Sequence, residues 1–406
     1  MQPDIEYENA IRCYLDNLFS GKDNSELNDD YIELNVVKPL TGYIAKNAPE
    51  GFQFSTPMFA WWDLTSACNF RCIHCLYNDT PYDSSHDLTD DEALNLADSL
   101  INDFGIVQIV LSGGEIFLRA ELLMKLIKKF KENNVGVAFA TNAALINDEQ
   151  IDFIADNMNR YTDRIQISLD GGTFETFQKI RQTDKFDKIV NNIEKLSKKG
   201  IRVTVVYTVN KINYKEVVTA YELADKIGAY DFVAGKMLAF NESHEKLMIS
   251  EREKMFLAQK LIEAQKDKKT ILKLGLFSNI SLLNIPEVTE ILKEDKFVES
   301  LKTFTSLPRR SCNRNDRISI RSDGRVYMCM DAECPNGLMG NIREKSLLEI
   351  WAERGKNVFF QPRLLENMGC KNCKFKTICN SGCMAKAYKR TGNLNSPEID
   401  CRFCSR

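Results

Sequence analysis

The chain has 406 residues, with 54 Lys and Arg against 57 Asp and Glu, and a formal net charge of −3 at pH 7. This length predicts one large domain plus a smaller one, and the balanced charge argues against nucleic acid as a partner. No apolar run approaches the ~18 residues of a membrane span, and the N-terminal MQPDIEYENAIRCYLDN is not a secretion signal. We therefore expect a cytoplasmic protein without a membrane partner, whose 13 cysteines are metal ligands or redox groups rather than disulfides.

In chain order, the first 58 residues contain a candidate helix near Tyr7–Phe19 and a candidate strand near Tyr31–Val37. Residues 59–240 then alternate short apolar runs with amphipathic helical patterns, which predicts βαβ units of roughly 30 residues and a parallel sheet. The six predicted strands are Phe59–Thr65, Val107–Leu111, Val135–Thr141, Arg164–Leu169, Arg202–Val209 and Asp231–Leu238. Six units predict an α/β fold, either an open barrel or a doubly wound sheet, with its chemistry at the C-terminal ends of the strands.

The predicted helices carry start and stop signals. Thr89 and Glu92 form a capping box before one helix, and Gly200 stands at the C-terminal end of another. One helix is marked by an apolar stripe, which comprises Leu122, Leu123, Leu126, Ile127 and Phe130. These signals support the alternation of strand and helix.

The rest of the chain differs from this pattern. Residues 241–307 are predicted to be a helical bridge, and residues 308–406 a small α+β domain rich in cysteine. Within the latter, RISIRSDGRVYMC alternates with period two around Asp323-Gly324, which predicts a β-hairpin. Because this segment has little apolar surface to bury, we expect it to fold around metals.

Three cysteines stand where the first strand is predicted to end. Cys68, Cys72 and Cys75 form the run CNFRCIHC directly after FAWWDLT. Three thiolates leave one position of a four-ligand site open, which an iron–sulfur cluster offers to an outside ligand. The alternative is a tetrahedral zinc site with His74 as the fourth ligand.

A glycine pair and a carboxylate follow the second predicted strand, in the run LSGGEIFLR. Gly113 and Gly114 allow close approach of the backbone to a ligand, and Glu115 places a carboxylate suited to an ammonium group. The alternative is a turn with a solvated acid.

Together, CNFRCIHC and SGGE make residues 59–240 resemble the radical S-adenosylmethionine (SAM) superfamily. The resemblance implies a partial (β/α)6 TIM-like barrel in which Cys68, Cys72 and Cys75 hold a [4Fe–4S] cluster. It also implies that the amino and carboxylate groups of SAM chelate the fourth iron. The reduced cluster would cleave SAM to a 5′-deoxyadenosyl radical that abstracts a hydrogen atom from the substrate.

The same resemblance places a set of residues around SAM, namely His74, Gly113, Gly114, Glu115, Asn142, Ser168, Asp170 and Arg181. Glu115 and the glycine backbone are expected to hold the methionyl amine, and Arg181 the carboxylate. The residues that close the third and fourth strands are expected to face the ribose or the carboxylate, and His74 to pack near adenine through its backbone. For the polar residues a helix cap or turn is the alternative; Ser168 and Asp170 also suit the start of a helix at Thr173.

The cysteine spacing after residue 308 is a second specific pattern. Cys312 is followed by eleven residues, Gly324, four residues and Cys329, and later comes GCKNCKFKTICNSGC, with Cys401 and Cys404 beyond it. This arrangement resembles the SPASM extension of radical SAM enzymes, which carries two auxiliary [4Fe–4S] clusters. The implied total is three clusters.

The resemblance also implies how the ligands divide. The first auxiliary cluster would be held by Cys312, Cys329 and Cys383, with either Cys334 or an open iron position completing it. The second would be held by the set Cys370, Cys373, Cys379 and Cys401, where Cys404 is an alternative to the last. Cys13 lies outside every motif and is expected to be a buried apolar residue.

The sequence therefore predicts a radical SAM/SPASM enzyme that oxidatively modifies a ribosomally synthesised peptide, with or without a leader. Decarboxylation of a haem-type tetrapyrrole, sulfatase maturation and a non-catalytic metal scaffold are the alternatives. Lysines crowd the auxiliary region, namely Lys371, Lys374, Lys376, Lys386 and Lys389. They either balance anionic clusters or dock an acidic electron donor such as flavodoxin or ferredoxin.

Overall fold

The computed structural model describes residues 53–76, 83–160, 162–239, 241–275, 315–361, 368–373 and 382–397. The helix and strand expected before residue 53 lie outside these ranges. So do five of the cysteines discussed above, namely Cys13, Cys312, Cys379, Cys401 and Cys404.

The described strands form one ten-stranded sheet in the order β10-β9-β8-β1-β2-β3-β4-β5-β6-β7. Their bounds are β1 Phe59–Asp63, β2 Gln108–Ser112, β3 Gly136–Thr141, β4 Arg164–Ser168, β5 Val203–Val209, β6 Asp231–Lys236, β7 Ile271–Gly275, β8 Arg317–Ile320, β9 Arg325–Tyr327 and β10 Leu338–Asn341. Strands β1 to β7 pair in parallel, each with the next. The six strands expected between residues 59 and 240 are confirmed, and they belong to a TIM-like sheet.

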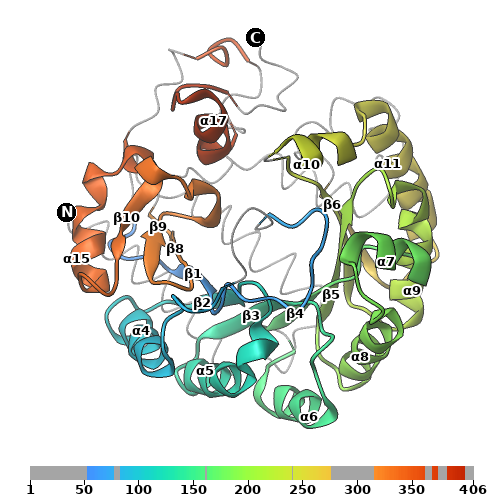
Figure 1. The fold of residues 1–406 in the computed structure, drawn as a ribbon, viewed down its shortest axis with the longest axis horizontal. Helices are drawn as coiled ribbons and strands as arrows, with labels where there is room; N and C mark the ends of the chain where they lie inside the picture. The colour runs from blue at the N-terminus through green and yellow to red at the C-terminus, as the bar shows by residue number, and fades with distance from the viewer. Residues whose placement is uncertain are drawn as a thin grey trace.

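The helices lie on the outer side of this curved sheet, which forms an incomplete ring (Figure 1). The α-helices are α4 Asp90–Asn102, α5 Ala120–Glu132, α6 Asp148–Asn157, α7 Phe174–Arg181, α8 Phe186–Lys198, α9 Val217–Lys226, α10 Glu242–Leu247, α11 Glu251–Gln265, α15 Leu347–Ala352 and α17 Met384–Thr391. The short 3₁₀ turns are η3 Ile116–Arg119, η4 Tyr214–Glu216, η7 Met330–Ala332, η8 Pro335–Gly337, η9 Glu353–Lys356 and η10 Val358–Phe360. The capping box of Thr89 and Glu92 is confirmed, and the whole predicted stripe of α5 is buried.

Strand β7 departs from the expectation of a helical bridge in residues 241–307. It follows α11 and pairs in parallel with β6, from Asp231 opposite Ile271 to Gly235 opposite Gly275. A run as short as ILKLG does not distinguish strand from helix by its apolar pattern, so pairing with β6 decides it.

The hairpin predicted around Asp323-Gly324 is confirmed, but it is not isolated from the barrel. Strands β8 and β9 pair antiparallel, and Gly324 adopts φ +84° at the turn between them. Strand β8 also pairs in parallel with β1, from Phe59 opposite Arg317 to Trp62 opposite Ile320. The cysteine-rich C-terminal region therefore begins as an extension of the barrel sheet.

Apolar packing continues across this junction. Trp62, Phe104, Ile320 and Trp351 belong to one buried cluster that spans barrel and hairpin. The indole Nε1 of Trp351 in α15 also donates to the carbonyl oxygen of Ser55 at 2.7 Å. Because they share a core, the hairpin and the barrel are expected to unfold together.

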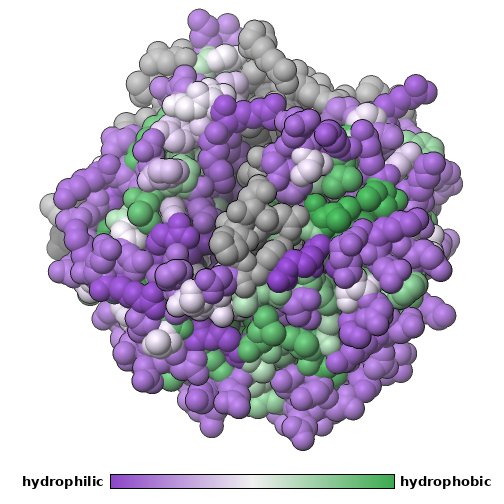
Figure 2. Space-filling view, in the orientation of Figure 1, coloured by the Kyte–Doolittle hydropathy of each residue, from purple (hydrophilic) through white to green (hydrophobic). Residues whose placement is uncertain are grey.

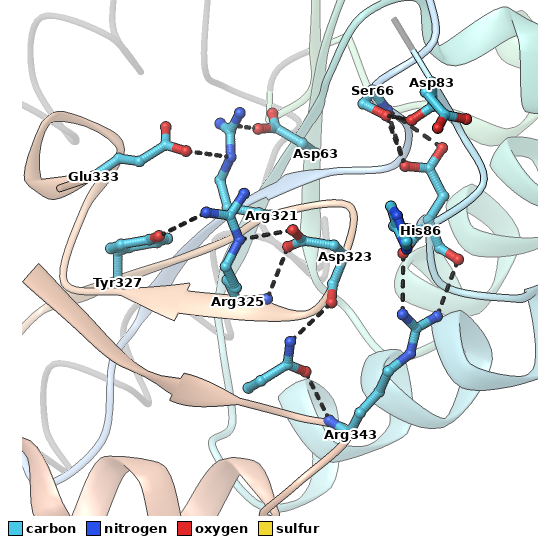
Figure 3. A network of polar contacts seen from close by, with 12 residues as sticks. Asp63, Ser66, Asp83, His86, Arg321, Asp323, Arg325, Tyr327, Glu333 and Arg343 are labelled. Atoms are coloured by element: carbon cyan, nitrogen blue, oxygen red, sulfur yellow. Dashed lines mark hydrogen bonds and ion pairs between the residues drawn. The ribbon is translucent and has the colours of Figure 1, made fainter. Parts of the chain in front are cut away.

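Two arginines join the hairpin region to the barrel by polar contacts (Figure 3). Arg321 pairs with Asp63 at the end of β1 and, through Nε, with Glu333 at 3.3 Å. Arg343 contacts both carboxylate oxygens of Glu92, at 2.8 and 2.9 Å. Asp63 is buried, and this burial raises its pKa although Arg321 opposes the shift. The charge of Arg321 therefore compensates a carboxylate that water does not reach.

The face shown in Figure 2 is largely hydrophilic along the outer ring of helices, with hydrophobic areas nearer the middle. Within the described ranges, none of the helices combines the length and the apolar character needed to cross a membrane.

Replacing Arg321 with Met should lower the free energy of unfolding by about 3–5 kcal/mol, because it leaves Asp63 buried without a counter-charge. The double variant R321M/D63N should recover most of that loss. Urea unfolding of the three proteins measures both effects. Equal losses in the single and double variants would contradict a compensating role for Arg321.

Candidate functional site

The polar residues predicted to form the site lie at the C-terminal ends of four neighbouring strands. The cysteine loop follows β1, Gly113 to Glu115 follow β2, Asn142 follows β3, and Asp170 lies two residues after β4. Because these strands are parallel and adjacent, their ends share one edge of the sheet. The fold therefore gathers residues that are more than 100 positions apart in the chain.

The glycine pair is required by a close approach between two backbone segments. The amide of Gly114 donates to the carbonyl of Thr65 at 2.8 Å, and that of Glu115 donates to the carbonyl of Ala67 at 2.8 Å. Gly113 has φ +137°, and a Cβ on Gly114 would overlap the carbonyl oxygen of Ala67. The glycines thus fix the segment that enters the cysteine loop against the end of β2. Their expected contact with the methionyl amine of SAM stays a prediction.

Glu115 is fully buried, and its carboxylate accepts three hydrogen bonds. Oε1 accepts from the hydroxyl of Thr141 at 2.6 Å and from the amide of Phe117 at 3.1 Å, and Oε2 accepts from the amide of Asn142 at 2.7 Å. Burial raises its pKa, and these hydrogen bonds oppose the rise. Within the described ranges no cation pairs directly with this carboxylate, and a carboxylate has about four acceptor positions, so one remains for a ligand.

The cysteine loop holds three thiols of differing exposure: Cys72 is buried, whereas Cys68 and Cys75 are partly exposed. Burial raises the pKa of Cys68 to about 11. Burial also raises the pKa of Cys72, against the opposing effect of Arg181. The thiols of Cys68 and Cys72 therefore keep their protons at neutral pH, and binding of a metal group would have to release them.

A chain of buried polar groups connects this loop to β4 and α7. Arg181 donates from Nη1 to the sulfur of Cys72 at 3.3 Å, and its Nη2 lies 2.6 Å from Oδ2 of Asp170. His74 Nε2 lies 3.2 Å from the same oxygen, and the amide of Thr208 donates to Oδ1 at 2.5 Å. Burial alone would raise the pKa of Asp170, but Arg181 and His74 outweigh it and lower the pKa to about 2.

These contacts refine the individual expectations. The side chain of His74 is directed to Asp170 through Nε2, and the structure does not bring His74 together with the three thiols in the way that a Cys3His zinc site needs. Indeed, no group of three His, Cys, Asp or Glu side chains in the described part of the chain is arranged to hold a single metal ion. Asn142 donates from Nδ2 to Asn69 Oδ1 at 2.8 Å, and Ser168 is partly exposed at the end of β4.

Sequence reasoning missed the residues that hold the site together. Thr141 and Asn69 support Glu115 and Asn142, while Asn213 donates to the carbonyl of Asp170 at 3.0 Å. Thr141 could have been predicted to face the site, because it is the last residue of a predicted strand and such residues lie at the edge where the site forms. Nothing in the sequence pointed to Asn213, because it follows β5 and meets Asp170 only in the folded protein.

Downstream, the described cysteines form two separate groups. Cys329, Cys334 and Cys383 pack around the apolar cluster of Met328, Ala332, Phe359, Met384 and Ala385. Cys370 and Cys373 pack with Met368 instead, and the amide of Cys373 donates to the carbonyl of Cys370 at 2.9 Å. The described cysteines are therefore separated in the structure in the same way as they were assigned to the two predicted ligand sets.

Comparison with known families accounts for both regions. Residues 62–224 match the radical SAM superfamily, and residues 312–374 match the SPASM iron–sulfur cluster-binding domain. The chain belongs to the radical SAM superfamily, carries a SPASM domain and is an enzyme. These domains indicate SAM and iron–sulfur clusters as its cofactors.

The relatives include both a synthase and a maturase. The chain is 26% identical over 354 residues to the AdoMet-dependent heme synthase of Methanosarcina barkeri, covering 86% of this chain and 97% of the relative. It is also 26% identical over 354 residues to mycofactocin maturase MftC of Mycobacterium tuberculosis, covering 85% and 83%. Among solved structures, SuiB of Streptococcus suis bound to precursor peptide SuiA has a TM-score of 0.66 at 16% identity, covering 91% and 80%. The last similarity shows a common fold.

Replacing Gly114 with Ala should destabilise the protein by about 3 kcal/mol, because the new methyl group meets backbone that cannot move without separating β1 from β2. Gly355→Ala is the matched control, since a Cβ there meets no atom within 4 Å. Thermal unfolding measures both. Equal, small effects would show that the loop tolerates the extra methyl group.

Proposed function

We propose that Cys68, Cys72 and Cys75 hold a [4Fe–4S] cluster whose open iron binds SAM. When bound, this pair supplies a 5′-deoxyadenosyl radical that removes a hydrogen atom from the substrate. The observation that carries the proposal is the buried carboxylate of Glu115, beside the cysteine loop and without a direct cationic partner among the described residues. An ammonium group would balance the buried charge, so Glu115 would hold the SAM amine.

The remaining residues of the site would orient SAM or keep its surroundings rigid. Asn142 and Ser168 stand at the ends of β3 and β4, where the ribose or carboxylate would lie. Asp170 is already engaged by Arg181 and His74, which supports a role in holding those side chains as well as any contact with SAM.

For the SPASM domain we propose two auxiliary [4Fe–4S] clusters. Cys312, Cys329, Cys334 and Cys383 would hold the first, and the packing of the last three around one apolar cluster supports that set. The second would be held by the set Cys370, Cys373, Cys379 and Cys401. The exposed side chains of Lys371 and Lys389 support a flavodoxin- or ferredoxin-type acidic donor that docks near these clusters.

We propose a ribosomally synthesised peptide as the substrate. Forming a new bond at the carbon that lost hydrogen requires removal of a second electron, and an auxiliary cluster can accept it. The fold shared with SuiB, whose structure holds a precursor peptide, and the similarity to a mycofactocin maturase support this choice. A haem-type tetrapyrrole is the second candidate, because the heme synthase relative is covered over 97% of its length.

Glu115→Gln should weaken SAM binding about tenfold or more, since a hydrogen bond to a charged group contributes about 1.5–3 kcal/mol. Thr141→Val is the matched control, because it removes a hydrogen bond to Glu115 and keeps the carboxylate. Equilibrium binding of SAM to cluster-loaded protein measures both. The assignment is wrong if the two variants weaken binding equally or if neither does.

Anaerobically reconstituted protein should contain about twelve iron atoms per chain, as three [4Fe–4S] clusters require. Changing Cys68, Cys72 and Cys75 together to Ala should remove about four of them and abolish SAM cleavage. Iron and sulfide analysis measures the count. A parent protein with only about four iron atoms would exclude the auxiliary clusters.

Mass spectrometry after turnover tests the substrate. Incubation with SAM, a reductant and candidate precursor peptides should give a peptide that has lost two hydrogen atoms, as oxidative crosslinking requires. Cys373→Ala should spare SAM cleavage and block this product, provided that the variant is folded. Turnover of an iron-containing porphyrin, with no peptide modified, would instead establish the tetrapyrrole alternative.

A further inference from the structure

Arg181, which the sequence assigned to the SAM carboxylate, also contacts the sulfur of Cys72 in the cysteine loop. Arg181 is 8% exposed, and its Nη1 donates to the Cys72 sulfur at 3.3 Å while its Nη2 pairs with Asp170 at 2.6 Å. Its Nε has no hydrogen-bond partner among the described residues. The guanidinium thus contacts a cysteine sulfur and a carboxylate of the protein, and the remaining N–H groups of its five donors leave the expected contact with the SAM carboxylate a prediction.

This arrangement is held from several directions. Arg181 is the last residue of α7, and Gln182 after it adopts φ +56°. The amide of Ile73 in the cysteine loop donates to the carbonyl of Ile180 at 3.0 Å, so the loop and the helix end are joined beside the side-chain contact. Because Asp170 is in turn fixed by the Thr208 amide, the guanidinium has little freedom to move away from the sulfur.

A fixed cation beside the sulfur of Cys72 would change the reduction potential of any cluster that Cys72 ligates. Hydrogen bonds to the sulfurs, net charge and solvent exposure set the reduction potentials of iron–sulfur clusters. Reduction adds negative charge, which a buried guanidinium stabilises more strongly in a low-dielectric site than in water. Arginine keeps its charge throughout the accessible pH range. The charge of Asp170 opposes this effect.

We propose that Arg181 is a positioning residue that raises the reduction potential of the loop cluster through Cys72, and that Asp170 limits the rise. The inference rests on the proposed function, in which Cys68, Cys72 and Cys75 hold that cluster. Arg181 and Asp170 were assigned by sequence to SAM alone. The proposal predicts that they shift the reduction potential of the loop cluster in opposite directions, and both shifts can be measured.

The test is a redox titration of anaerobically reconstituted full-length protein without SAM, followed by electron paramagnetic resonance. The loop-cluster signal is the one absent from the variant with Cys68, Cys72 and Cys75 changed to Ala. Arg181→Gln should lower the reduced-to-oxidised ratio at a fixed potential at least about tenfold, which for one electron is a shift of about 59 mV to more negative values. Asp170→Asn should shift the potential in the opposite direction.

Arg71→Gln is the matched control. Arg71 lies on the same loop but is exposed, and its Nη1 donates to the carbonyl oxygens of Cys68 and Phe70. Solvent screens its charge, so its removal should leave the reduced-to-oxidised ratio at a fixed potential unchanged from that of the parent protein.

The outcomes separate this inference from the proposed function. A parent protein without the loop-cluster signal would refute the proposed function itself. If the parent protein shows the signal but neither Arg181→Gln nor Asp170→Asn changes the reduction potential, the proposed role of Arg181 is refuted. The proposed function then still stands. Shifts of equal size and sign in the Arg181, Asp170 and Arg71 variants would also overturn the role of Arg181. If the Arg181→Gln variant does not bind the cluster, Arg181→Lys replaces it in the test. Lys keeps the positive charge but lacks the planar set of guanidinium donors, so it should shift the reduction potential by a smaller negative amount.

Discussion

The close approach of the backbone after β2 to the backbone after β1 is the constraint on which the site depends. Two amide-to-carbonyl hydrogen bonds, from Gly114 to Thr65 and from Glu115 to Ala67, join these segments. Only residues without a Cβ fit between them. The same contact therefore sets where the cysteine loop begins and where the Glu115 carboxylate points, so that the groups proposed for the cluster and for SAM share one rigid support.

Charge is distributed around this support in two different ways. Glu115 is buried with hydrogen-bond donors but without a direct cationic partner among the described residues, a state suited to a cationic ligand. Asp170 is buried with Arg181 and His74 and is compensated within the protein. The two carboxylates, one after β2 and one after β4, are thus compensated in different ways: Glu115 by hydrogen-bond donors, and Asp170 by the charged side chains beside Cys72.

The C-terminal region is connected to the site through the sheet itself. Strand β8 continues the barrel on the free side of β1, the strand that leads into the cysteine loop. Arg321 joins the end of β1 to Glu333, which lies between Cys329 and Cys334 in the chain. Strand β8 and Arg321 thus connect the strand that leads into the cysteine loop with the region proposed for the first auxiliary cluster.

The sequence by itself determined the elements with local signals: the six βα units, the capping box at Thr89, the hairpin at Gly324, and the radical SAM and SPASM motifs. Periodicity, caps and turn residues act over a few positions, so they can be recognised without the fold. Only the tertiary structure decided the pairing of β7 and β8, the partners of Arg181, and the support of Asp170 by Asn213. These contacts join residues up to some 260 positions apart. Parallel strand pairing and the compensation of buried charges depend on which segments meet in the folded protein, and a local sequence pattern does not contain that information.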